Sequence, residues 1–248
     1  MVARIEVSDV LGYPVCVGEP EEVLDLLWQR LTAGRQTHVV TLNAEMILAA
    51  ERAAEAEEAL GSADIYVSDG VGLTWAARMM RQDSIHRYPG IDLVYDLMSK
   101  LAQSEGNVYL LGAEPGVAEE AGRRLCDDLP GLRVVGTRDG YFDETSEEQV
   151  VSNIMAAKPD LLLVGMGFPK QERFIAAHRA ELHTPVMVGV GGALEVFAGR
   201  RSRAPRWMRG TGLEWAWRSM QDLSRLKRLG LLPRFIFLVL RQARRRVA

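Results

Sequence analysis

The sequence contains few of the residues from which disulfide frameworks are built. It has 2 cysteines and 4 histidines in 248 residues, with no CxxC motif. Cys16 and Cys126 lie far apart in the chain. Isolated cysteines of this kind are typical of proteins in a reducing compartment. We therefore expect both to be small buried hydrophobic side chains in a reduced cytoplasm, and we do not expect a disulfide.

Several familiar signals are also missing. The N-terminal stretch MVARIEVSDV lacks the continuous apolar core of a signal peptide, so we do not expect export. The patterns GxGxxG and GxxxxGK[ST] are absent, which gives no support to a standard dinucleotide site or a Walker site. No two aspartates stand two residues apart, so there is no DxD motif to hold a divalent ion.

The composition is that of a globular protein, but the charge is unevenly divided. The hydrophobic share of 48% and the charged share of 25% fit one large domain, or one domain with an appendage. The net charge is −3, yet residues 1–199 carry 16 Lys/Arg against 31 Asp/Glu, and residues 200–248 carry 14 against 2. We predict a catalytic domain over 1–199 and a basic appendage over 200–248 with an anionic partner, either nucleic acid or a lipid surface.

The first 199 residues alternate strand and helix patterns. Six short apolar or β-branched runs, most of them followed by a helical pattern, are predicted strands: THVVTL (37–42), IYVS (65–68), NVYLLG (107–112), LRVVGT (132–137), DLLLVG (160–165) and PVMVGV (185–190). Such runs lack clean alternation and are typical of a parallel sheet that is buried on both faces. The sequence therefore predicts an α/β fold with a Rossmann-like parallel sheet covered by helices.

Residues that follow the strands are the candidates for a ligand site, because ligands bind at the carboxyl edge of such sheets. Polar and glycine residues stand there after every strong strand: Thr41, Asn43, Asp69, Gly70, Gly112, GMGFPKQE (165–172) and GVGGALE (189–195). Glycines let the backbone approach phosphates closely, and helix N-termini add donors. This favours a nucleotide or sugar nucleotide, although glycine also ends strands for purely conformational reasons.

A set of motifs identifies a family. VTLNAEMI, DGVGL, RYPGID, LLGAEPG, GYF, VGMGFPKQE, GVGGALEVFAG and RAPRWMRGTGLEWAWR follow one another along the chain. In order and spacing they resemble the bacterial WecG/TagA/CpsF glycosyltransferases, from about residue 5 to about residue 230. No single motif is decisive, but the combination is highly specific.

The resemblance implies a transfer reaction. It implies that a hexose or N-acetylhexosamine, such as N-acetylmannosamine, moves from a UDP-sugar to a polyprenyl-diphosphate-linked sugar in surface polysaccharide or teichoic acid synthesis. It also implies an inverting, metal-independent enzyme without a cofactor, which agrees with the missing DxD motif. The alternative is a regulatory module that binds the nucleotide sugar without turnover.

The resemblance also assigns the catalytic pocket. Asp69 matches the family's general base, and the alternative is that it caps the following helix. Thr41 and Asn43 match pocket residues that hold the donor or the acceptor sugar. For them the alternative is turn formation and helix capping around Asn43.

Further substrate-binding residues follow from the same match: Arg87, Gly112, Gly165, Gly167, Lys170, Gln171, Glu172, Gly191, Gly192 and Glu195. A lysine near a diphosphate offsets its charge, although Lys170 also suits a solvated helix start. Glu172 is the competing carboxylate, with a helix cap or structural ion pair as its alternative. Arg87 alternatively forms a surface ion pair. Glu195 departs from the family pattern, where an Asp after an aromatic residue is usual.

Without a metal, the departing UDP needs fixed cations. Arg203, Arg206 and Arg218 of the appendage are the candidates, because a guanidinium binds phosphate oxygens bidentately. The appendage would then act as an active-site lid, and the alternative is a generic basic surface.

The end of the chain predicts an interfacial anchor. The apolar run from Leu229 to Leu240 contains Pro233 and Arg234, and as a helix of about 18 Å it is too short for about 30 Å of hydrocarbon. Eight Lys/Arg and no acids follow Asp222. We expect residues 213–248 to bind an anionic membrane on its cytoplasmic face, and we expect no nucleic acid partner because FIFLVL has no use on a phosphate backbone. The alternative is a core helix or an oligomer-forming helix.

Overall fold

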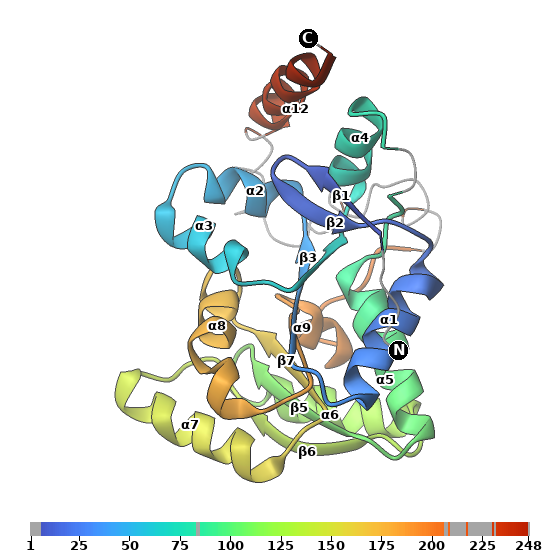
Figure 1. Ribbon diagram of the computed structural model, residues 1–248. Helices are drawn as coiled ribbons and strands as arrows, with labels where there is room; N and C mark the ends of the chain where they lie inside the picture. The colour runs from blue at the N-terminus through green and yellow to red at the C-terminus, as the bar shows by residue number, and fades with distance from the viewer. Residues whose placement is uncertain are drawn as a thin grey trace.

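The computed structural model describes residues 6–82, 85–205, 208, 217, 230 and 232–247. Its centre is an eight-stranded sheet in the order β1-β2-β4-β3-β8-β7-β5-β6 (Figure 1). The strands are β1 (Val7–Val10), β2 (Tyr13–Cys16), β3 (Thr37–Leu42), β4 (Ile65–Ser68), β5 (Asn107–Gly112), β6 (Arg133–Arg138), β7 (Leu161–Gly165) and β8 (Val186–Gly189). All neighbouring strands pair in parallel except β1 and β2.

The six predicted strands are present, and the predicted α/β fold is confirmed. Three of them match the predicted bounds, and the other three differ by one residue at one or both ends. The sequence did not predict the antiparallel hairpin of β1 and β2, whose turn is Leu11-Gly12 with φ of 56° and 90°. Two residues with positive φ suit a tight hairpin, but leucine is an unusual choice there, so the sequence carries no clear signal for this turn.

Helices cover both faces of the sheet. One face packs against α1 (Pro20–Thr32), α5 (Gly90–Gln103), α6 (Val117–Asp128) and α9 (Ala193–Phe197). The other packs against α2 (Ala44–Ala50), α3 (Ala54–Gly61), α4 (Val71–Met79), α7 (Glu144–Ala157), α8 (Lys170–Leu182) and α12 (Leu232–Val247). Successive strand residues alternate between the two cores, as Val39 and Val40 do.

The two cysteines differ in exposure. Cys16 is buried, and burial raises the pKa of its thiol to about 11. Cys126 is exposed, because it lies on the solvent side of α6, so the prediction that both are buried is wrong for this residue. Both are free thiols, which agrees with the expectation of no disulfide.

The C-terminal helix α12 lies beside α4 at one end of the molecule (Figure 1). Phe235 and Val239 are 2% and 0% exposed and join the core cluster that contains Leu73 and Met80. Part of the apolar run therefore packs on the body, as the core-helix alternative requires. No helix within the described parts of the chain has the length and apolarity needed to cross a membrane. The domain boundary near residue 199 stays a prediction.

The first part of the predicted membrane-binding segment, residues 213–231, lies largely outside the described residues, and Arg206 and Arg218 lie outside them as well. Trp217 is described, and its indole Nε1 donates a hydrogen bond to the carbonyl of Ser202 at 3.1 Å.

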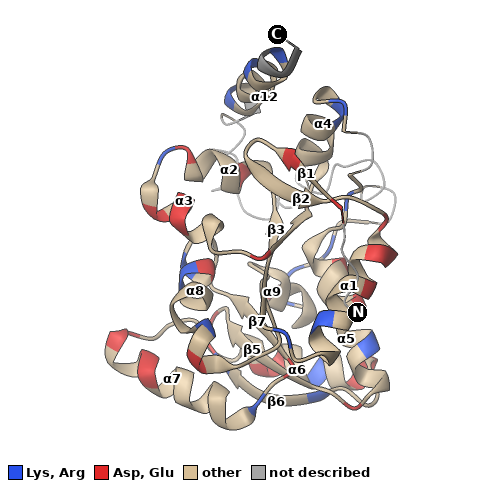
Figure 2. Ribbon diagram, viewed as in Figure 1, with Lys and Arg blue, Asp and Glu red and all other residues tan. Residues whose placement is uncertain are grey.

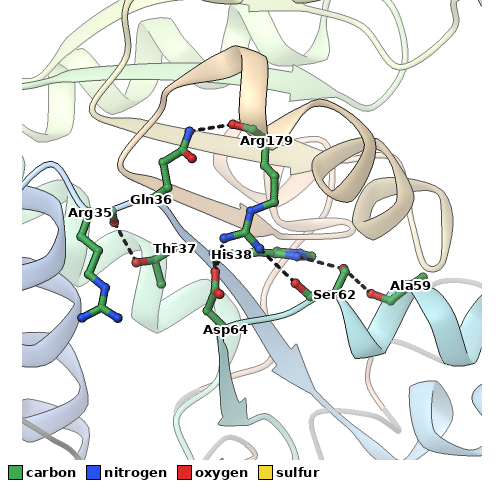
Figure 3. Close-up of polar contacts among 8 residues, drawn as sticks. All are labelled: Arg35, Gln36, Thr37, His38, Ala59, Ser62, Asp64 and Arg179. Carbon is green, nitrogen blue, oxygen red and sulfur yellow. Dashed lines mark hydrogen bonds and ion pairs between the residues drawn. The ribbon is translucent and has the colours of Figure 1, made fainter.

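The amino ends of β3 and β4 are closed by a polar cluster (Figure 3). Asp64 accepts a bond from the backbone N–H of His38 at 2.8 Å and forms an ion pair with Arg179 at 2.6 Å. Ser62 lies within 3.2 Å of the Nδ1 atom of His38, and Gln36 donates to the carbonyl of Arg179 at 2.6 Å. His38 is fully buried, and desolvation, followed by the charge of Arg179, lowers its pKa to about 4.

Candidate active site

The carboxyl ends of β3 and β4 place the first predicted site residues next to each other. Leu42 pairs with Ser68, and the N–H of Asp69 donates to the carbonyl of Leu42 at 2.8 Å. Asp69 and Asn43 therefore leave the sheet at the same point. Thr41 is 7% exposed and lies just inside this edge.

The segment with the RYPGID motif returns to the same place. The N–H of Tyr88 donates to the carbonyl of Ser68 at 2.9 Å, which holds the half-buried Arg87 beside the end of β4. A Cβ on Gly90 would lie 2.8 Å from Thr41 Oγ1, so only glycine lets the start of α5 pack this closely on Thr41. The fold thus brings together three segments that are separate in the sequence.

The structure distinguishes the capping alternatives for Asp69 and Asn43. The N-cap of α4 is Gly70, with φ of 88°, so Asp69 stands one residue before the cap. Asn43 is the N-cap of α2, and its side chain accepts from the backbone N–H groups of Glu45 and Met46 at 3.0 and 3.1 Å. Capping is therefore correct for Asn43 and does not explain Asp69. The catalytic role of either residue stays a prediction.

The glycines after β5, β7 and β8 form a closely packed cradle. A Cβ on Gly112, where φ is 130°, would lie 2.4 Å from the Gly165 carbonyl oxygen, and one on Gly165 would lie 2.8 Å from that of Gly191. The N–H of Gly140 donates to the carbonyl of Ala113 at 3.0 Å. Backbone segments from four strand ends are thus in contact along one edge, where glycines allow a close approach of the backbone to a ligand.

The side chain of Gln171 forms hydrogen bonds with two of these glycine turns. Its Oε1 atom accepts from the N–H of Gly167 at 3.1 Å and from the N–H of Gly191 at 3.0 Å, and its Nε2 donates to Glu172 at 2.8 Å. Gln171 and Glu172 are 2% and 0% exposed. Gln171 therefore holds the turns in place, whatever contact with a ligand it has in addition.

Glu172 is a buried carboxyl group with unusual electrostatics. Desolvation raises its pKa to about 7, although the bond from Gln171 opposes the shift. Its Oε2 atom has no hydrogen-bond partner in the part of the chain that the structure describes. The N-cap of α8 is Pro169 and not Glu172, and Glu172 has no ion pair in that part of the chain.

Lys170 lies at the exposed rim of the cradle. It donates to the carbonyl of Gly140 at 3.0 Å and lies 5.1 Å from the ring centroid of Phe142. The neighbouring Tyr141, three residues after β6, is 69% exposed and was not among the predicted site residues. The GYF motif was its signal, because an aromatic side chain left exposed at a ligand edge offers a flat surface for a base or a sugar.

Two ion pairs join the first residues of the appendage to the body of the protein. Arg201 lies 2.8 Å from the carboxylate of Glu195, and Arg203 pairs with Asp92 in the first turn of α5. Glu195 and Arg203 were both predicted to contact the nucleotide. In this structure each faces an oppositely charged side chain, and their contact with substrate stays a prediction.

No group of three or more His, Cys, Asp or Glu side chains suited to a metal ion occurs among the described residues. The expectation of a metal-independent reaction remains a prediction.

Comparison with known proteins gives a consistent result. Residues 8–248 match the Glycosyl transferase WecG/TagA/CpsF family. The chain is 37% identical over 207 residues to the N-acetylglucosaminyldiphosphoundecaprenol N-acetyl-beta-D-mannosaminyltransferase of Staphylococcus aureus strain MW2, which covers 84% of this chain and 81% of that protein. The same protein from strain NCTC 8325 / PS 47 gives the same identity and coverage.

Proposed function

The chain belongs to the Glycosyl transferase WecG/TagA/CpsF family, and from this membership we propose that it transfers N-acetylmannosamine or a related hexose from a UDP-sugar to a polyprenyl-diphosphate-linked sugar. The pathway would be the synthesis of a surface polysaccharide or teichoic acid. The observation that carries the proposal is the shared sheet edge, because Asp69, Thr41 and Asn43 lie on the same carboxyl edge as the glycine cradle.

The proposed reaction is a single inverting displacement. An acceptor hydroxyl oxygen attacks the anomeric carbon of the donor as the bond from that carbon to UDP breaks. The hydroxyl proton passes to the carboxylate of Asp69, and the bonding electrons leave with the diphosphate. Thr41 and Asn43, which flank Asp69 at the ends of neighbouring strands, would hold the sugars by hydrogen bonds.

The negative charge on the departing UDP needs stabilisation. The Lys170 ammonium at the rim of the glycine cradle would supply it from one side. Arg203 would supply it from the appendage by exchanging Asp92 for the diphosphate, and Arg206 and Arg218 are further candidates. Because these side chains carry positive charge, we propose that no divalent metal is required.

We further propose that the enzyme works at the cytoplasmic surface of the cell membrane. Its acceptor carries a lipid, and the end of the chain contains eight basic residues after Asp222 together with an apolar helix. Basic residues near an anionic leaflet contribute about 1 kcal/mol each. The α12 helix would therefore hold a globular enzyme at the surface without spanning it.

The test is a donor screen with a panel of UDP-sugars and a short-chain, water-soluble diphosphate-linked acceptor analogue. We expect acceptor-dependent UDP release with one donor, preferentially UDP-N-acetylmannosamine, and unchanged rates in excess EDTA. A rate that falls on chelation and returns with Mg²⁺ would overturn metal independence. Tight UDP binding without release from any donor would instead favour the regulatory module that binds the nucleotide sugar without turnover.

A further inference from the structure

Helix α4 carries apolar residues on two faces. One face is buried in the core around Leu73. The other is formed by three large side chains at four-residue spacing, Val71, Trp75 and Met79, which are 40%, 37% and 41% exposed. A surface helix normally exposes polar residues on this second face, so the exposed stripe needs a partner.

Helix α12 shows the same division. Phe235 and Val239 are buried against α4, and a Cβ on Gly72 would lie 3.6 Å from the Phe235 ring. Three further apolar side chains are exposed to solvent: Ile236, Phe237 and Leu240, at 44%, 66% and 39%. The two helices in contact thus leave two apolar stripes uncovered at one end of the molecule (Figure 1).

The charges on these two helices are of one sign. Neither helix contains Asp or Glu, and both carry arginines (Figure 2). The exposed arginines on and just after the helices are Arg78, Arg81, Arg234, Arg241 and Arg244. Apolar side chains on helices that carry only cations match an anionic phospholipid surface, whereas two copies of these helices facing each other would repel.

We propose that α4 is the second half of the membrane-docking surface, so that Val71, Trp75 and Met79 enter the interface of an anionic bilayer beside α12. The inference rests on the proposed function for its acceptor and adds an element of the catalytic body to the anchor. Helix α4 begins two residues after Asp69 and is about 12 Å long. Docking would therefore hold the proposed base close to the plane in which a lipid-linked diphosphate lies.

The test uses the full chain and vesicles of phosphatidylglycerol and phosphatidylcholine. Truncation is unsuitable because it would uncover the core residues that Phe235 and Val239 cover. The double substitution Trp75→Glu/Met79→Glu should lower the fraction bound to vesicles at least about tenfold, because it places two anions in the interface.

The matched control is Met155→Glu. Met155 and Met79 are both 41% exposed, but Met155 lies on α7, far from α4 and α12 (Figure 1). It should bind vesicles within about twofold of the unaltered chain. Equal binding by Trp75→Glu/Met79→Glu and the unaltered chain would overturn the inference. So would a change confined to the oligomeric state, measured by sedimentation velocity, because it would assign the surface to a second copy.

A second readout reports on α4 directly. A fluorescent label on Met79→Cys, in a Cys126→Ser background, should shift to the blue on vesicles and be quenched by spin-labelled lipid. A label that stays in water while the protein binds would show that α12 docks without α4 and overturn the inference. UDP release by the unaltered chain with a water-soluble acceptor tests the proposed function separately, so the two failures are distinguishable.

Discussion

The two ends of strands β3 and β4 differ in how their polar residues are arranged. At their amino ends, His38, Asp64 and Arg179 form a compact cluster of side-chain hydrogen bonds and an ion pair (Figure 3). At their carboxyl ends, Thr41, Asn43 and Asp69 lie at the same edge as the closely packed glycine turns, and Asp69 stands one residue before the N-cap of α4. The comparison teaches that polar residues near a sheet are best assigned by the edge on which they lie.

The carboxyl edge also holds Glu172, a side chain whose charged form is disfavoured by burial. Glu172 is buried beneath the glycine turns with a raised pKa, whereas His38 is buried at the amino edge with a lowered one. Desolvation disfavours the charged form of both side chains, but the histidine belongs to the cluster with Asp64 and Arg179, and the glutamate accepts a bond from Gln171 beneath the glycine turns.

The largest effect is expected for Asp69→Asn at the carboxyl edge. Removing the proton acceptor should lower the transfer rate by about 10² to 10⁴, because this is the usual contribution of a general base. UDP binding should remain within about threefold, since the amide keeps the size of the side chain. Single-turnover rates and UDP titrations measure the two quantities, and a near-normal rate in a folded variant would remove Asp69 from this role.

The two buried titratable groups should act on stability with opposite signs over nearly the same pH range. The lowered pKa of His38, about 4, means that its contribution is present above pH 6.5 and is lost as the pH falls through 4. The raised pKa of Glu172, about 7, means that its contribution is present below pH 4.5 and is lost as the pH rises through 7. Each amounts to about 3 kcal/mol.

Substitutions should separate these two contributions. Relative to the unaltered chain, Glu172→Gln should become less stable as the pH falls from 7.5 to 4.5, and His38→Asn should become more stable. Urea unfolding at both pH values measures the difference. Parallel profiles for all three proteins would mean that neither group titrates in this range.

Gln171→Ala should lower the free energy of unfolding more than Gln36→Ala, which makes the same change at the amino edge. It leaves the amides of Gly167 and Gly191 without their acceptor, which we expect to lower the free energy of unfolding by about 2 kcal/mol and to raise the donor KM. The matched variant is Gln36→Ala, which removes one bond to Arg179 and should cost about 1 kcal/mol without changing KM. Equal KM values in the two variants would separate Gln171 from the site.

The smallest effect is expected for Lys170→Met. Loss of a cation at the rim of the cradle should raise the donor KM by about tenfold, with little change in stability. The control is Arg173→Met on the same helix, whose guanidinium pairs with Glu55 of α3. If both variants bind donor equally well, the ammonium of Lys170 does not contact the diphosphate.

Much of this arrangement could be predicted from local sequence. Buried parallel strands are continuous apolar runs, so their bounds were predicted to within two residues, and residues after strand ends necessarily share an edge. Two features of the site could not be predicted, because they depend on how distant segments pack. They are the burial of Gln171 and Glu172 and the ion pair between Arg203 and Asp92. Two further features were not predicted because the local sequence carries no clear signal for them. They are the exposure of Cys126 and the hairpin at Leu11-Gly12.

The most direct test of the account compares two aspartates that flank one strand. Asp64 precedes β4 and Asp69 follows it, so Asp64→Asn and Asp69→Asn make the same chemical change at opposite edges. For each variant, kcat and the free energy of unfolding are measured together. We predict that Asp64→Asn loses about 2 kcal/mol of stability with kcat within about twofold, because it weakens the bonds to His38 and Arg179. We predict that Asp69→Asn keeps its stability and loses at least about 100-fold in kcat. A similar loss of activity in both variants, or full activity in Asp69→Asn, would contradict the assignment of structure to one edge and chemistry to the other.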